Sequence, residues 1–141
     1  MAQSAAHAPV TTAVPAAPSA PVVIIGAGFG GLAAARVLGT AGIATVLIDR
    51  QNHHLFQPLL YQVATAGLSA ADIAAPIRAI LRPWPSLSVL MDTVIGIDRS
   101  ARTVQLASGG QQAFSQLIVA SGARHAYFSN PEWARLAPGI K

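Results

Sequence analysis

The stretch that decides the fold is PVVIIGAGFGGLAAARVLGTAGIATVLIDR, residues 21–50. It opens with four β-branched residues, Val22–Ile25, a pattern typical of a strand that is buried on both faces of a parallel sheet. The alanine-rich run that follows, about residues 29–38, favours a helix, and the glycines after it end that helix. A second apolar run, Ala44–Ile48, predicts another strand. The stretch therefore predicts a strand, a turn, a helix and a strand.

The turn between the first strand and the helix carries the pattern G-x-G-x-x-G, at Gly26, Gly28 and Gly31. In dinucleotide-binding turns the first glycine allows the tight turn, the second lets the backbone approach a pyrophosphate, and the third lets the helix pack close to the strand. Gly30 leaves additional room. Asp49 ends the second strand, and an acid at this place accepts hydrogen bonds from ribose hydroxyls. We therefore expect a dinucleotide site with phosphate at the helix N-terminus.

The motif leaves the identity of the dinucleotide open. The Asp49 carboxylate would repel a 2′-phosphate, which argues against NADP, although Arg50 beside it weakens that argument. FAD and NAD remain. A glycine-rich turn that binds no ligand is the alternative interpretation, but the flanking strand, helix and acid favour binding.

Beyond Asp49 the sequence predicts further secondary structure around this unit. Ser69 and Asp72 have the spacing of a capping box and predict a helix, which Pro76 either restarts or kinks. Two stretches, LSVLMDTVIGID (87–98) and TVQLASG (103–109), resemble a small antiparallel meander, with a hairpin signal at 108–110. The last apolar run, QLIVASGA (116–123), predicts a strand that ends in a small-residue turn.

Composition limits the other possibilities. The chain is 52% hydrophobic and only 10% charged, so most of it should be packed. Residues 1–20 are rich in alanine and proline and predict a disordered leader, while 21–141 form one domain. That leader has no Lys or Arg and is broken by proline, unlike a signal peptide. Residues 22–48 contain Arg36 and six glycines, which is unlike the usual sequence of a membrane-spanning helix.

Charge and cysteine content narrow the chemistry further. The net charge of +4 is scattered without a basic run, which disfavours nucleic-acid binding. The absence of cysteine excludes disulfides and thiolate chemistry. His53 and His54 are adjacent and would point opposite ways in an extended loop, so we expect no shared metal. Gln57, Tyr61 and Gln62 are candidates for approaching a flavin ring, or for ordinary packing.

These motifs together carry a resemblance to a known family. The GAGFGG turn, the acid after the second strand, the meander and a strand closing in A-S-G resemble the FAD half of the two-dinucleotide-binding flavoprotein reductases, where A-T-G is usual. Among these reductases, the type II NADH dehydrogenases are similar to two further stretches of the chain. These are NHHLFQPLLYQVATAGLSAADIAAPIR (52–78) and the tail GARHAYFSNPEWARLAPGIK (122–141). The resemblance covers residues 21–141. It implies an α/β, Rossmann-like FAD-binding domain with a parallel sheet and a small meander.

The resemblance also implies site residues and an activity. It implies FAD contacts from Gly26, Ala27, Gly28, Phe29, Gly30, Gly31, Asp49, Arg50, Asn52, Val94, Ala120, Ser121 and Gly122. Apart from the resemblance, Arg124 is a candidate pyrophosphate neighbour because it lies just after the Gly122 turn. The complete enzymes pass electrons from NADH through FAD to a quinone, at the cytoplasmic side of a membrane and peripheral to it. No catalytic side chain or metal is implied within this segment.

The length of the chain limits what it is expected to do. Such enzymes carry a second glycine motif for NADH, a return segment that completes the flavin site, and a C-terminal membrane-facing region, which are not found in these 141 residues. We therefore expect an incomplete two-dinucleotide fold without NADH:quinone activity of its own. The alternatives are a stand-alone dinucleotide-binding module or remnant, another flavoprotein reductase, or a nicotinamide-dependent dehydrogenase. Sulfide:quinone and disulfide reductases are disfavoured because they use cysteines.

Overall fold

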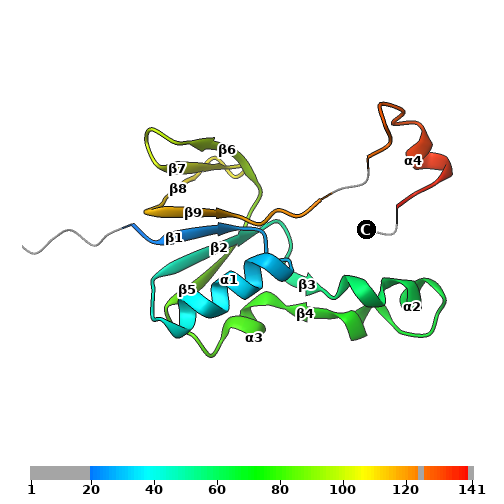
Figure 1. The fold of residues 1–141 in the computed structure, drawn as a ribbon, viewed down its shortest axis with the longest axis horizontal. Helices are drawn as coiled ribbons and strands as arrows, with labels where there is room; N and C mark the ends of the chain where they lie inside the picture. Colours follow the sequence, from blue (N-terminus) through cyan, green and yellow to red (C-terminus); the bar gives the residue numbers. More distant parts are fainter. Residues whose placement is uncertain (1–19, 124–125, 140–141) are drawn as a thin grey trace, which may run out of the picture.

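A parallel sheet of four strands organises the computed structural model, which describes residues 20–123 and 126–139. The strand order is β5-β2-β1-β9, formed by Leu87–Met91, Thr45–Asp49, Val22–Ile25 and Gln116–Val119 (Figure 1). The helix α1, Phe29–Thr40, connects β1 to β2. The strand-helix-strand unit and the parallel sheet expected from the sequence are therefore confirmed. Nearly all of the expected leader lies outside the described residues.

The first strand is the centre of the sheet because it pairs on both sides. Val23 aligns with Val46 of β2 and with Leu117 of β9. Its side chains alternate between two cores: Ile24 packs toward the helices and Val23 toward the antiparallel strands. The continuous β-branched run is thus explained by burial on both faces.

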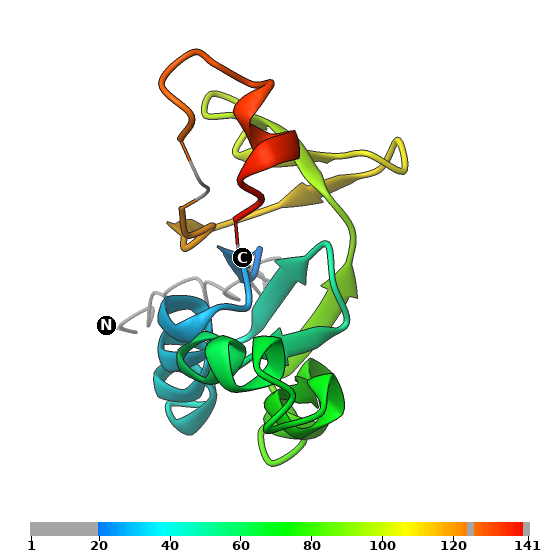
Figure 2. The same ribbon diagram turned by 90° about the vertical axis from the view of Figure 1, so that its right-hand side faces the viewer.

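Helices cover one face of the sheet. Figures 1 and 2 show α1 and α3, Ile77–Leu81, on the same side of it, opposite β6–β8. The core between helices and sheet consists of Ile24, Ala27, Leu32, Ala35, Leu47, Ile77 and Leu81. Trp84 packs at the edge of this core, and its side chain lies directly against Gly39 of α1.

A three-stranded antiparallel sheet covers the other face. It contains β6 (Val94–Asp98), β7 (Thr103–Leu106) and β8 (Gln111–Ala113), paired in that order. The shared core is Val23, Ile48, Val104, Leu106 and Phe114. The expected hairpin at 108–110 is confirmed, because this turn joins β7 to β8 and places Gly109 at φ +93°.

The expectation for residues 87–98 was wrong in its first half. Leu87–Met91 does not belong to the meander but forms β5, which pairs in parallel with β2 from Leu87↔Thr45 to Met91↔Asp49. The alternating pattern that suggested a half-exposed strand arises because β5 lies at the edge of the sheet. An edge strand exposes part of its surface even in a parallel sheet.

The segment between β2 and α3 is irregular. β3 (His53–Leu55) pairs antiparallel with β4 (Ala74–Pro76), and between them lie η1 (Gln57–Leu59), α2 (Leu60–Ala64) and η2 (Ala70–Ile73). The capping box is present, but the α-helix expected after it is not: it caps η2, a single 3₁₀ turn. The chain is already extended at β4, because the residue before a proline is disfavoured in helix, and α3 begins only after Pro76.

The C-terminal segment extends from β9 through an irregular stretch to the short helix α4, Trp133–Leu136. Tyr127 holds this segment in a compact loop, because its hydroxyl donates to the Ala137 carbonyl and accepts from the Gly139 N–H, at 3.0 and 3.1 Å. Across residues 20–123 and 126–139, no helix has both the length and the apolar character needed to cross a membrane.

Candidate dinucleotide site

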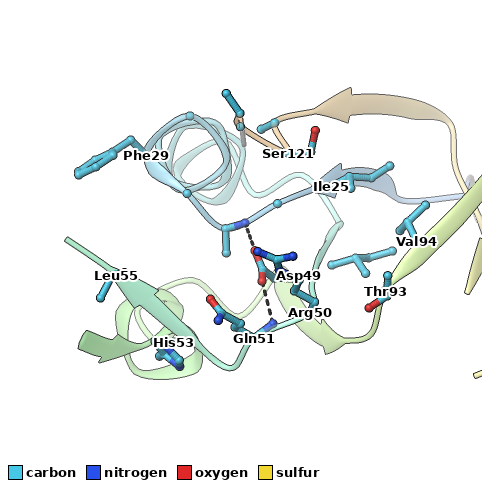
Figure 3. Close-up of a pocket in the computed structure, with 18 of the residues that line it drawn as sticks. Ile25, Phe29, Asp49, Arg50, Gln51, His53, Leu55, Thr93, Val94 and Ser121 are labelled. Carbon is cyan, nitrogen blue, oxygen red and sulfur yellow. Dashed lines mark hydrogen bonds between the residues drawn. The ribbon is translucent and has the colours of Figure 1, made fainter. Parts of the chain in front are cut away.

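A cavity of about 1070 Å³ opens at the carboxyl ends of β1, β2, β5 and β9. This is the end of a parallel sheet at which ligands of such folds bind. The lining residues are Ile25, Gly26, Ala27, Gly28, Phe29, Gly30, Ile48, Asp49, Arg50, Gln51, His53, Leu55, Gln57, Asp92, Thr93, Val94, Ala120, Ser121, Gly122 and Ala123 (Figure 3).

Two glycines of the turn are required by the protein itself. Gly26 has φ +100°, and a Cβ built there would collide with the carbonyl oxygen of Ala120. A Cβ on Gly31 would collide with the carbonyl oxygen of Gly26, so α1 packs against the turn without any intervening side chain. These positions therefore play the structural roles expected of the first and third glycines.

Gly28 differs because nothing in residues 20–123 and 126–139 requires its lack of a side chain. Its backbone is extended, with φ −72° and ψ −168°, and a Cβ there would meet no atom within 4 Å. Gly28 is the N-cap of α1, which has no side-chain cap and no acid in its first turn. The free N–H groups and positive dipole end of the helix thus meet an open space, a combination that favours an anion.

The Asp49 carboxylate lies beside this turn at the end of β2. Its Oδ2 accepts a hydrogen bond from the Ala27 N–H at 2.6 Å, and its Oδ1 accepts one from the Gln51 N–H at 2.8 Å (Figure 3). Each carboxylate oxygen keeps further acceptor capacity. The side chain can therefore shape the turn and accept hydrogen bonds from a ribose at the same time.

The wall beyond Asp49 consists of the residues that follow β5. The Asp92 N–H donates to the Asp49 carbonyl at 2.9 Å, which places Asp92, Thr93 and Val94 next to the acid. The Asp92 carboxylate accepts a hydrogen bond from the Ser108 hydroxyl at 2.6 Å. That hydroxyl holds the pKa of Asp92 below its usual value.

The last strand supplies the remaining backbone. The Ala120 N–H donates to the Ile25 carbonyl at 2.8 Å, so the A-S-G turn continues the pairing of β9 with β1. Gly122 has φ +72°, a conformation that glycine adopts readily. Ser121 and Gly122 thereby line the cavity beside the glycine turn, since Gly26 lies directly against Ala120 and Ser121.

Aromatic rings gather at the outer side of the turn. Phe29 packs edge-to-face on His54 and on Phe56, with ring centroids 5.0 and 5.5 Å apart. The His54 Nδ1 lies 3.0 Å from the Ala27 carbonyl oxygen. Because a carbonyl only accepts, Nδ1 is the protonated nitrogen of this ring. His54 thus anchors β3 to the turn.

The structure brings most of the predicted site residues together. All of them line the cavity except Gly31, which is buried under the turn, and Asn52, whose carbonyl accepts from the Ile77 N–H. Arg124 lies outside the described residues. Sequence reasoning missed Gln51, Asp92 and Thr93, whose signal was their place directly after strands β2 and β5.

The other candidates from the sequence separate in space. Gln57 lines the cavity, whereas Tyr61 and Gln62 do not and are hydrogen-bonded to each other. His53 lines the cavity and contacts Asn52, while His54 contacts Ala27. No group of three or more His, Asp or Glu side chains in the described part of the chain is placed to hold a metal ion.

Comparison with known proteins agrees with this geometry. The sequence model of the pyridine nucleotide-disulphide oxidoreductase family matches residues 20–137. The type II NADH:quinone oxidoreductase Ndh of Mycobacterium tuberculosis is 48% identical over 123 residues, which cover 85% of this chain and 27% of that protein. A second mycobacterial enzyme, NdhA, is 49% identical and is covered to 26%. The chain thus spans about a quarter of the length of these relatives.

Solved structures share the fold. The sulfide:quinone oxidoreductase of Aquifex aeolicus superposes with a TM-score of 0.70 at 25% identity, over 77% of this chain and 26% of that one. The NDH2 of Plasmodium falciparum superposes with a TM-score of 0.67 at 21% identity, over 79% of this chain and 24% of that one.

Proposed function

Because this chain belongs to the pyridine nucleotide-disulphide oxidoreductase family, we propose that it forms the FAD-binding part of a type II NADH:quinone oxidoreductase. The observation that carries the proposal is the open cavity above Gly28, bounded by Asp49 and by the turn after β9. The identity of nearly half the aligned residues to two type II enzymes supports the choice of this branch of the family.

The residues present fit FAD. The N–H groups at the start of α1 would bind the pyrophosphate, Asp49 would accept hydrogen bonds from ribose hydroxyls, and Val94 would contact the adenine. The other lining residues that would hold the cofactor are Arg50, Gln51, His53, Leu55, Gln57, Ser121 and Gly122. When bound, FAD supplies the isoalloxazine ring, which accepts a hydride and passes electrons on. These residues hold and orient it.

In the whole enzyme, NADH is the electron donor and a quinone is the acceptor. By its similarity to type II enzymes, the complete protein is proposed to act as a peripheral protein at the cytoplasmic face of a membrane. The chain described here contributes the cofactor site. Because it spans about a quarter of the length of the type II enzymes it matches, we expect no turnover of NADH by these 141 residues alone.

Another flavoprotein reductase is the second candidate, because the sulfide:quinone oxidoreductase fold superposes well. Sulfide chemistry needs thiols to take up sulfur, and these 141 residues contain no cysteine. Sequence identity to the mycobacterial NADH enzymes also favours the first proposal.

The test is FAD binding by the purified 141-residue chain, measured as flavin content and as a dissociation constant. Gly28→Val should abolish it without unfolding the protein, because the new side chain extends into the cavity and extended backbone suits a β-branched residue. Ala33→Val, at an exposed position of α1 outside the cavity, is the matched control. Stoichiometric FAD in the control and none in Gly28→Val supports the proposal. A folded wild-type chain that binds no FAD, or a Gly28→Val variant that binds it normally, contradicts it.

A further inference from the structure

The cavity wall at Asp92, Thr93 and Val94 is fastened to a distant turn of the chain. The Ser108 hydroxyl donates to Asp92 Oδ2 at 2.6 Å, and the Ala107 N–H donates to the Thr93 carbonyl at 2.8 Å. Both donors belong to the turn between β7 and β8. Ser108 itself does not line the cavity.

This wall lies where the adenosine end of a dinucleotide would be. The pyrophosphate is adjacent to Gly28, and the ribose that follows it is adjacent to Asp49. The Asp92 N–H is hydrogen-bonded to the Asp49 carbonyl, so Asp92–Val94 is the next part of the wall. Because the adenine follows the ribose in the cofactor, it meets this part of the wall.

We propose that Ser108 is a positioning residue for adenosine binding, because its hydrogen bond to Asp92 holds Thr93 and Val94 at the cavity wall. This inference rests on the proposed dinucleotide site and adds a residue that acts on it from outside the cavity.

The geometry around Asp92 supports this role. Its Oδ1 accepts the Thr93 N–H at 2.7 Å while its Oδ2 accepts the Ser108 hydroxyl, so both oxygens are directed at the protein. The Ser108 hydroxyl lowers the pKa of Asp92, as expected for a donor that binds the ionised carboxylate. Gly109, at φ +93°, allows the tight turn that presents Ser108.

The test compares FAD and ADP binding by the wild-type chain, Ser108→Ala and Ser108→Thr, using titration calorimetry. Ser108→Ala should weaken FAD and ADP by the same factor, about fivefold, which corresponds to one ordinary hydrogen bond. Ser108→Thr keeps the hydroxyl and should restore most of the affinity. Ser100→Ala is the matched control, because Ser100 is an exposed serine in the β6–β7 turn of the same sheet.

The proposal is supported if Ser108→Ala weakens the affinities for FAD and ADP equally, while Ser108→Thr restores them and Ser100→Ala leaves them unchanged. Unchanged affinity in Ser108→Ala overturns it, and so does weakening of FAD without weakening of ADP, because the effect would then lie at the flavin end. If the folded wild-type chain binds neither ligand, the proposed function itself fails and this inference fails with it.

Discussion

Ala27 and Asp49 are joined by a 2.6 Å hydrogen bond from the Ala27 N–H to Oδ2 of the carboxylate, which ties the glycine turn to the end of the neighbouring strand. The acid therefore has a part in shaping the turn, besides its expected contact with a ribose. A charge-assisted bond of this kind is stronger than an ordinary one. Phosphate binding at the turn and ribose binding at the acid thus depend on the same side chain.

Replacing Asp49 by alanine should weaken FAD binding at least tenfold. The turn loses its charge-assisted hydrogen bond, worth about 1.5–3 kcal/mol, and the ribose loses its acceptor. Asp98→Ala is the matched control, because Asp98 accepts two N–H groups, those of Ser100 and Ala101, in a turn away from the cavity. Equal FAD affinity in Asp49→Ala and Asp98→Ala, measured by fluorescence titration, would refute this role.

Alanine substitutions at the glycines of the turn should have two different effects on the free energy of unfolding. Alanine at Gly26 or Gly31 should destabilise the fold by more than about 2 kcal/mol, because each Cβ collides with backbone. Alanine at Gly28 should leave the free energy of unfolding within about 0.5 kcal/mol of wild type. Urea unfolding of the three variants measures this difference. Similar stability in all three would mean that the close packing of α1 against the turn is not as described.

Gly39→Ala should destabilise the protein although alanine favours helix. In an exposed helix this change gains about 1 kcal/mol, but a Cβ at position 39 would lie 2.6 Å from Cγ of Trp84. The sign should reverse in a Trp84→Ala background, where the ring is gone and alanine regains its advantage. Urea unfolding of the four chains gives the coupling. Additive effects of the two changes would contradict this contact.

The capping box at Ser69 should make stability depend on pH. Hydrogen bonds from the Ser69 side chain and N–H lower the pKa of Asp72 in the folded protein. Such a group contributes stability above its unfolded pKa, and the contribution is lost as the pH falls through its folded pKa. Asp72→Ala should therefore lower the unfolding temperature at about pH 7. The difference from wild type should begin to shrink only below about pH 4 and should vanish as the pH falls through the lowered pKa of Asp72. If Asp72→Ala lowers the unfolding temperature by the same amount at every pH, the charge of the Asp72 carboxylate plays no part.

The sequence predicted the parts of the site that depend on local pattern. The strand before Gly26, the helix after Gly28 and the acid at Asp49 follow one another within a single strand-turn-helix-strand unit, so spacing alone located them. The A-S-G turn was found because an apolar strand leads directly into it. The boundaries differ slightly: the helix continues through Gly39 to Thr40, and the second strand runs from Thr45 to Asp49 instead of from Ala44 to Ile48.

What sequence reasoning missed depends on pairing between distant residues. Leu87–Met91 was placed in the meander because its alternation resembles that of a half-exposed strand. Its parallel partner, β2, lies some forty residues earlier in the chain. Asp92 and Thr93 were missed for the same reason, since their place in the cavity depends on where β5 ends. The bonds Ser108–Asp92 and His54–Ala27 bring together segments that no local signal relates.

FAD binding in the cavity is tested most directly by an NMR titration of the isotope-labelled chain with FAD. The amides of the glycine turn, Asp49–Gln51, Thr93–Val94 and Ser121–Gly122 should shift, and those of the smaller pocket beside Arg78 and Trp84 should change little. Shifts concentrated around Arg78 and Trp84, or absent from Gly28 and Asp49, would contradict it.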